Sequence, residues 1–256
     1  MVLDLSRIQA DLAGDAIGAD AHLYPSVDST NRVIRDLATL GHGTLVMAEH
    51  QTAGRGRHAR KWYAPPETSL HMSLALGWPP ELQTTRAVML AALSVSDAIT
   101  QVTGLHPTIK WPNDVLLSGK KVCGILAESL SSASPPLIVL GIGINVNFDP
   151  AREADVPDTA GSLMLETGAE VCRHDLLTAV IQCVRMWYRC VKEDSVRIYE
   201  AWSSRLGISG QSVQVTESSG SWEGTALGVN LDGALQVQAA DGARHTLYAG
   251  DVSIRS

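Results

Sequence analysis

The apolar segments between residues 108 and 148 constrain the fold most strongly. The segment "TIKWPNDVLLSGKKVCGILAES" (108–129) predicts two strands joined by a Ser-Gly turn. The next segment, "PLIVLGIGINVNF" (136–148), is almost continuously apolar, as in a largely buried strand. Two earlier runs, "TLVMAEHQ" (44–51) and "TSLHMSLALGW" (68–78), also predict strands, whereas apolar residues at helical spacing predict a helix over 84–102. Because strands and helices are mixed in this order, we expect an α+β fold.

The pattern changes after residue 206. Residues 174–206 have a helical pattern, whereas the following stretch consists of short alternating runs separated by Asp232-Gly233 and Asp241-Gly242, which favour tight hairpin turns. We therefore predict two domains, 1–206 and 207–256, the second being a small β-barrel. The acidic segment 149–161, with its two prolines, predicts a surface loop.

Composition excludes several classes of protein. The chain of 256 residues has a formal net charge of −7, which argues against a general nucleic-acid or membrane-surface binder. No apolar run approaches the about 20 residues that a membrane helix needs. The four cysteines form no C-x-x-C pair, and the histidines show no metal-binding spacing, so we expect reduced thiols, no structural metal and a cytoplasmic protein.

The stretch "GRGRHARKW" (54–62) concentrates positive charge in this acidic chain. Its glycines permit close backbone approach to a ligand, and each arginine offers a planar donor fork that fits phosphate or carboxylate. Three interpretations stay open at this point: a grip on a small phosphate ligand, a grip on a nucleic-acid backbone, or a solvated surface loop. Trp62 either covers a ligand ring or belongs to the core.

A second polar cluster lies in "KWPNDVLLSGKKVCGI" (110–125). Pro112 favours a strand end, with Asn113 and Asp114 at its rim. Strand alternation places Lys121 on the same face as Cys123, and Lys120 on the other. The P-loop and dinucleotide-binding patterns are both absent, so any phosphate is held in another way.

An ordered set of motifs resembles the biotin protein ligase family. The set comprises "DSTN" (28–31), "QTAGRGRHARKW" (51–62), "KWPND" (110–114), "GKKVCGIL" (119–126) and "GIGINVN" (141–147), and the terminal "GDVSIR" (250–255) resembles the family's last strand. The resemblance implies a catalytic domain of the fold shared with lipoate ligases and related to class II aminoacyl-tRNA synthetases, followed by an SH3-like barrel. It also implies a ligase that condenses biotin with ATP to biotinyl-5′-AMP, releases pyrophosphate, and transfers biotin to a lysine of a biotin carboxyl carrier protein, such as that of acetyl-CoA carboxylase.

The resemblance also assigns site residues. Lys121 and Arg57 would be catalytic. The reaction brings a carboxylate and an α-phosphate together, and two anions approach each other only where positive charge is already in place. Matches to biotin-binding positions are Ser29, Thr30, Asn31, Gln51, Gly54, Arg55, Gly56, Arg57, Lys121 and Gly124. Matches to ATP- or adenylate-binding positions are Arg57, Arg60, Trp62, Asn113, Asp114, Lys121, Asn145 and Arg255. ATP would enter with Mg²⁺, for which Asp114 is a candidate ligand.

Two other functions are compatible with parts of the sequence. A lipoate ligase or lipoyl transferase would use a similar fold, and a non-catalytic nucleic-acid-binding module would use the arginine loop on phosphates. Only 28 residues precede Ser29, fewer than the about 50 that a DNA-binding domain needs, so we expect a monofunctional enzyme without a repressor function, DNA or membrane partner. A homodimer is left open.

The basic loop departs from the family motif, and this departure generates a prediction. Many members have "GRGRRGR", whereas His58 and Ala59 stand here in place of an arginine and a glycine. Histidine is mostly neutral at pH 7, so we expect the loop to release biotinyl-5′-AMP somewhat faster than the fuller motif does. The double variant His58→Arg, Ala59→Gly should slow adenylate dissociation in a stopped-flow assay. An unchanged dissociation rate would contradict the idea.

Overall fold

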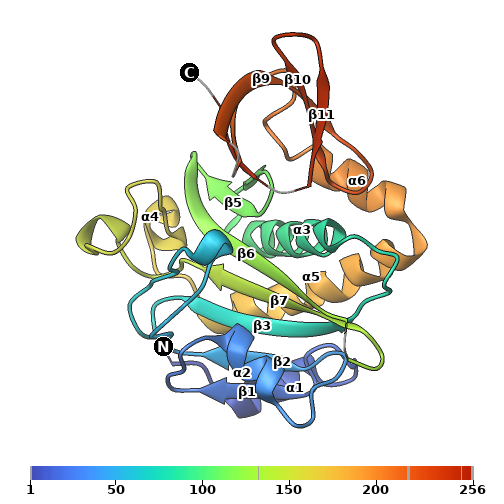
Figure 1. Cartoon of the computed structure of the whole chain (residues 1–256). Helices are drawn as coiled ribbons and strands as arrows, with labels where there is room; N and C mark the ends of the chain where they lie inside the picture. Colours follow the sequence, from blue (N-terminus) through green and yellow to red (C-terminus); the bar gives the residue numbers. More distant parts are fainter. Residues whose placement is uncertain (1, 132, 218–219, 249, 255–256) are drawn as a thin grey trace.

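A seven-stranded sheet forms the centre of the larger part of the chain (Figure 1). The computed structural model describes residues 2–131, 133–217, 220–248 and 250–254. The sheet has the order β1-β2-β3-β7-β6-β5-β4, and only the pair β1 and β2 is parallel. Its strands are β1 (Ala21–Tyr24), β2 (Leu45–Ala48), β3 (Leu70–Gly77), β4 (Thr108–Lys110), β5 (Asp114–Leu117), β6 (Lys120–Leu130) and β7 (Leu137–Ile144).

The two faces of this sheet are covered differently. One face packs on the main core, built with α1 (Leu5–Leu12), α3 (Thr84–Thr103), α5 (Arg173–Glu193) and α6 (Ser195–Ser203). On the other face, α2 (Thr30–Asp36) closes a smaller cluster, in which Ile34 packs with Val46, Ala75 and Val139. Because α2 covers only part of this second face, the rest is left for a cavity. Further along the chain lie η1 (Arg57–Ala59), η2 (Pro150–Arg152) and α4 (Leu163–Thr167).

A second, antiparallel sheet follows α6. Its strands are β8 (Ser212–Glu217), β9 (Gly220–Val229), β10 (Leu235–Ala239), β11 (Arg244–Leu247) and β12 (Asp251–Ile254), in the order β11-β10-β9-β8-β12. Both Asp-Gly pairs lie in hairpin connections, since Asp232-Gly233 joins β9 to β10 and Asp241-Gly242 joins β10 to β11. Between the described residues of β11 and β12 no pairing closes this sheet into a barrel.

The β9–β10 turn docks the second sheet against the first part of the chain. Trp111 Nε1 donates to the carbonyl oxygen of Gly233 at 2.9 Å, and the Arg86 guanidinium pairs with Asp232 Oδ1 at 3.0 Å. Gly233 has a φ of 79°, and a Cβ there would collide with Met89 of α3, so the close approach depends on glycine. The second sheet therefore lies directly above α3 and β5, as Figure 1 shows.

The predicted elements are largely present. The strand, helix and hairpin patterns are confirmed, except that residues 108–129 form three strands rather than two, because the KWPND segment is itself a turn between β4 and β5. The segment 149–161 is a connection that contains only η2. Among the described residues, no helix is both long and apolar enough to cross a membrane.

A buried ion pair ties the start of α5 to the end of β2. Arg173 Nη1 donates to Glu49 Oε2 at 2.6 Å, and the two side chains are only 1% and 7% exposed. The other carboxylate oxygen of Glu49 accepts from the Leu3 amide at 2.7 Å. This carboxylate therefore joins three segments that are distant in the sequence.

Removing one member of this pair should be costly. Glu49→Ala leaves the Arg173 guanidinium buried without its carboxylate, and we expect a loss of about 3–5 kcal/mol in the free energy of unfolding, measured by denaturant titration. Glu170→Ala, which removes an exposed carboxylate near the start of α5, is the control and should change little. A loss below about 1 kcal/mol, the value for exposed pairs, would contradict the prediction.

Candidate active site

Glycines on β6 and β7 form the floor of the site. Gly124 of β6 lies directly opposite Gly143 of β7. Gly141 precedes Gly143 by two residues and therefore lies on the same face of the sheet. Ile142, which lies between Gly141 and Gly143, points to the helical core on the other face. A Cβ on Gly143 would overlap the Trp62 ring, and a Cβ on Gly124 would lie 2.9 Å from it. The absence of side chains here therefore makes room above the sheet, and part of that room is taken by Trp62.

A cavity of about 640 Å³ opens over this floor. It is lined by residues that are far apart in the sequence, and most of the predicted site residues are among them. These are Ser29, Thr30, Asn31, Gln51, Arg55, Gly56, Arg57, Arg60, Trp62, Asn113, Asp114, Lys121, Gly124 and Asn145. Gly54 is not among the lining residues: it is buried, and its Cβ position faces the Gln51 amide and the Trp62 carbonyl. Arg255 lies outside the described residues.

One end of the cavity is polar but uncharged. The Thr30 amide and hydroxyl both donate to Gln51 Oε1, at 2.8 and 3.1 Å, which fixes the orientation of the Gln51 amide. Gln51 Nε2 then lies 3.4 Å from His71 Nδ1. Burial lowers the pKa of His71 to about 4, so the imidazole is neutral at pH 7 and accepts from Gln51. The side chains of Thr30, Gln51 and His71 therefore present hydrogen-bonding groups in fixed orientations and carry no charge.

The basic loop is a short hairpin that lies over the cavity. The Gly56 amide donates to the Arg60 carbonyl at 2.7 Å, and the Trp62 amide donates to the Gly54 carbonyl at 2.9 Å. Between them, His58 has a left-handed backbone, with φ 54° and ψ 38°. The strained position is therefore residue 58, not residue 59, where the fuller family motif has its glycine.

The face of Lys121 was predicted wrongly. The register of β5 and β6 shifts so that Leu116 pairs with Lys121 but Val115 pairs with Cys123. This bulge sends both Val122 and Cys123 into the core, whereas Lys121 lines the cavity. An extra residue in one strand breaks the alternation, so parity counted along the sequence gives the wrong face.

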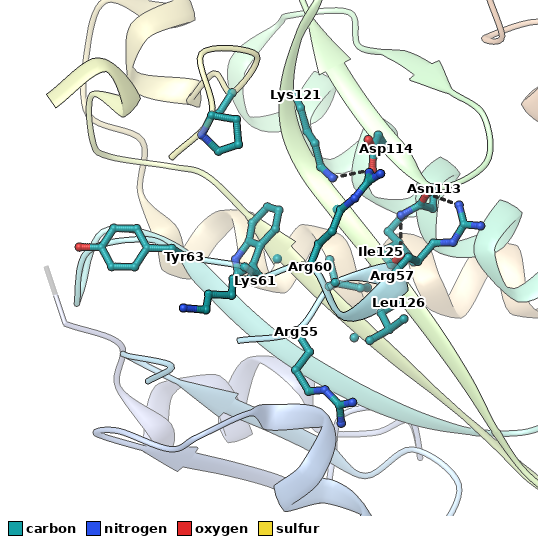
Figure 2. A pocket seen from close by; sticks show the side chains of 18 of the residues that line it. Arg55, Arg57, Arg60, Lys61, Tyr63, Asn113, Asp114, Lys121, Ile125 and Leu126 are labelled. Carbon is teal, nitrogen blue, oxygen red and sulfur yellow. Dashed lines mark hydrogen bonds and ion pairs between the residues drawn. The ribbon is translucent and has the colours of Figure 1, made fainter. Parts of the chain in front are cut away.

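The cationic end of the cavity is held by polar partners. Lys121 Nζ lies 2.7 Å from Asp114 Oδ1, and Arg57 Nη1 donates to Asn113 Oδ1 at 3.1 Å. Figure 2 shows Lys121, Asp114, Asn113, Arg57 and Arg60 gathered on one side of the cavity, whereas Arg55 extends away from them. Among the described lining residues, six are Lys or Arg (Arg55, Arg57, Arg60, Lys61, Lys110 and Lys121) and two are acidic (Asp114 and Asp155). The cavity therefore favours an anion within an acidic chain.

Two buried polar atoms beside the glycine floor have no hydrogen-bond partner among the described residues. They are Trp62 Nε1 and Asn145 Oδ1. The Asn145 amide nitrogen donates to the Gly161 carbonyl at 2.9 Å, so the amide oxygen remains for a ligand. Buried polar atoms are rarely left unpaired, which favours a ligand with both a donor and an acceptor here.

Sequence reasoning missed two parts of the cavity wall. One is the loop after η2, which contributes Asp155, Val156, Pro157, Thr159 and Ala160, and the other is the second sheet, which contributes Thr216, Val252 and Ser253. The Lys121 amide donates to the Thr159 carbonyl at 2.8 Å, which brings the loop to β6. Neither of these two parts carries a motif. Gly141 and Gly143 do belong to the motif "GIGINVN", but the sequence did not identify them as site residues.

Within the described residues, no group of three or more His, Cys, Asp or Glu side chains could hold a metal ion.

Comparison with known proteins shows to which class of protein this fold belongs. Residues 23–145 match the Biotin/lipoate A/B protein ligase family, and residues 208–255 match the Biotin protein ligase C terminal domain. The structure resembles that of a biotin protein ligase from Aquifex aeolicus in complex with biotin and ATP, with a TM-score of 0.77, 28% identity, and coverage of 92% of this chain and 98% of that one. The fold is thus that of a ligase domain followed by a small β domain.

Two relatives of similar sequence show to which family within this class the chain belongs. The chain is 33% identical to the bifunctional ligase/repressor BirA of Bacillus subtilis, over 98% of this chain and 79% of that protein. It is 30% identical to the biotin–[acetyl-CoA-carboxylase] ligase of Paracoccus denitrificans, over 88% of this chain and 96% of that protein. The chain therefore belongs to the biotin protein ligase family, and it is a biotin ligase enzyme.

The glycine floor can be tested without a ligand. Gly143→Ala places a methyl group where the Trp62 ring now lies, so we expect the ring to move into solvent and acrylamide to quench its fluorescence more strongly. Stability should fall by no more than about 1 kcal/mol, since only a loop side chain is displaced. Gly207→Ala is the control, because a Cβ there meets nothing within 4 Å. In a Trp62→Phe background the quenching change should vanish, and its persistence would contradict the assignment.

Proposed function

We propose that this enzyme activates biotin with ATP and transfers it to a lysine of a carrier protein. A biotin carboxylate oxygen attacks the α-phosphorus of MgATP, which forms biotinyl-5′-AMP and releases pyrophosphate. The lysine amine then attacks the carbonyl carbon of the mixed anhydride, which forms an amide and releases AMP. The observation that carries the proposal is a single cavity with an uncharged polar end and a cationic end.

The uncharged end fits the head group of biotin. Biotin ends in a cyclic urea with one carbonyl and two N–H groups, and Ser29, Thr30 and Gln51 are proposed to pair with it. Lipoate ends in a dithiolane ring without such groups, so it would displace water from these polar side chains without offering them a hydrogen bond in return. That cost favours biotin as the substrate. Asn31, Arg55, Gly56 and Gly124 are proposed to complete this part of the site, whereas Gly54 lies behind Gln51 and Trp62.

The cationic end fits the reacting groups. Lys121 and Arg57 are proposed to neutralise the biotin carboxylate and the α-phosphate, which otherwise repel each other. Asp114 holds the Lys121 ammonium at 2.7 Å, so the position of this charge is fixed by the protein. Mg²⁺ enters with ATP, and Asp114 is the candidate to contact it. Arg60 and Asn113 are proposed to contact the nucleotide phosphates.

The unpaired atoms beside the glycine floor support an adenine site. Trp62 Nε1 and Asn145 Oδ1 offer one donor and one acceptor. Adenine carries ring nitrogens that accept and an amino group that donates, so it could satisfy both of these buried atoms. The basic loop is proposed to order over the adenylate and to exclude water until the acceptor lysine arrives.

The proposal also covers the domain organisation, the partner and the location of the protein. We propose a domain boundary at residues 206 and 207, and an SH3-like barrel for the second sheet with Arg255 near the adenylate. The expected partner is a biotin carboxyl carrier protein, and the expected location is the cytoplasm. DNA binding and repression are not part of the proposal, because the net charge is −7 and the cations gather in the cavity. A homodimer remains compatible with it.

The first test is pyrophosphate release from ATP. We expect release with biotin but not with lipoate, and a decrease of about 10²–10³-fold in Lys121→Ala, the scale for losing one positioned electrostatic group. Lys120→Ala is the matched control, because its ammonium donates to the Asp158 carbonyl and does not line the cavity. Equal release with lipoate would contradict biotin as the specific substrate. Undiminished release by Lys121→Ala would contradict the catalytic role of Lys121.

A further inference from the structure

Asn31 occupies a fixed place above the sheet. It is 5% exposed and lies over Gly141, where a Cβ would collide with its amide. Gly141 pairs across the sheet with Ser73 of β3 on one side and with Leu126 of β6 on the other. The amide therefore fits into a space that is open only because β7 has glycine at this position.

Two side chains hold the ends of this amide. Asn31 Nδ2 donates to Glu128 Oε2 at 2.7 Å, and Ser73 Oγ donates to Asn31 Oδ1 at 2.5 Å. Glu128 comes from β6 and Ser73 from β3, so the amide bridges both neighbours of β7. Glu128 does not line the cavity, and none of the motifs includes it.

The two partners differ in what they specify. A serine hydroxyl both donates and accepts, so Ser73 pairs equally well with either end of an asparagine amide. An ionised carboxylate only accepts, so Glu128 pairs with the nitrogen end and repels the oxygen end. A carboxylate also makes a stronger hydrogen bond than a neutral acceptor does. Glu128 therefore decides which way round the amide of Asn31 is held.

This orientation matters for a cyclic urea. With one N–H and one oxygen lone pair used, the Asn31 amide keeps one further donor and one further acceptor position. A cyclic urea presents a carbonyl next to an N–H, so the reversed amide would place donor against donor and acceptor against acceptor. We propose that Glu128 is a positioning residue that fixes the Asn31 amide in the orientation that recognises the urea head of biotin. The inference rests on the proposed function.

Glu128 has a second neighbour that provides a control. Arg35 Nη1 lies 3.5 Å from Glu128 Oε1, on the partly exposed side of the carboxylate. Exposed ion pairs of this kind contribute little. Arg35→Ala should therefore leave biotin binding unchanged, because the contact between Glu128 and Asn31 remains.

The test is biotin affinity measured by isothermal titration calorimetry on the full chain. We expect the Kd for biotin to rise about 10- to 100-fold in Glu128→Ala, as for loss of a hydrogen bond to a charged group. Glu128→Met, which keeps the bulk but lacks an acceptor oxygen, should show the same loss. Glu128→Gln should restore only part of the affinity, since its amide can accept from Asn31 but can also donate to it and so no longer fixes the orientation. The KM for ATP should stay unchanged in all three variants.

A double-variant cycle separates positioning from a general structural effect. If Glu128 acts through Asn31, then adding Glu128→Met to Asn31→Ala should cause no further loss of biotin affinity. Wild-type affinity in Glu128→Met, or a full additional loss in the Asn31→Ala background, would overturn the inference. Wild-type enzyme that binds no biotin would instead refute the proposed function, so the two failures are distinguishable.

Discussion

The missing side chains at Gly124, Gly141 and Gly143 are the constraint on which the site depends. A residue with a Cβ at Gly141 or Gly143 would collide with Asn31 or Trp62, respectively. The opposite face of the same strands carries the main apolar core, so the sheet is rigid where it supports the cavity. Glycines on this sheet let the Asn31 amide and the Trp62 ring approach the backbone closely, which places both side chains at the cavity for the proposed binding of biotin and adenylate.

The charges of the site are arranged by distortions of regular structure. A bulge in β6 moves Lys121 from the core face to the cavity, where Asp114 meets its ammonium at 2.7 Å. A left-handed residue, His58, turns the basic loop so that Arg57 reaches Asn113. A bulge and a strained turn are local costs, and they are found here where side chains must be aimed at a common point. An acidic chain can thus present a locally positive cavity.

The second sheet contributes to the same cavity and is not a separate appendage. The turn around Gly233 fixes it against α3, and Val252 and Ser253 of β12 then line the cavity. The Gly250 carbonyl accepts from Arg57 at 3.5 Å, so the basic loop contacts both sheets. The proposed ordering of this loop over the adenylate would therefore involve the second domain's residues directly.

The order of elements, the Asp-Gly hairpins and the motif residues that line the cavity could be predicted from the sequence, because these depend on local periodicity, turn chemistry and short motifs. The face of Lys121 follows from the fold instead, since the bulge that sets it is visible only when β5 and β6 pair. The same holds for Val252 and Asp155, which lie in segments without a motif and reach the cavity through folding. Glu128 is the clearest case, because the role proposed for it depends on its hydrogen bond with Asn31, 97 positions away in the chain. Contacts between distant segments depend on how strands pair and sheets dock, and no local pattern in the sequence records them.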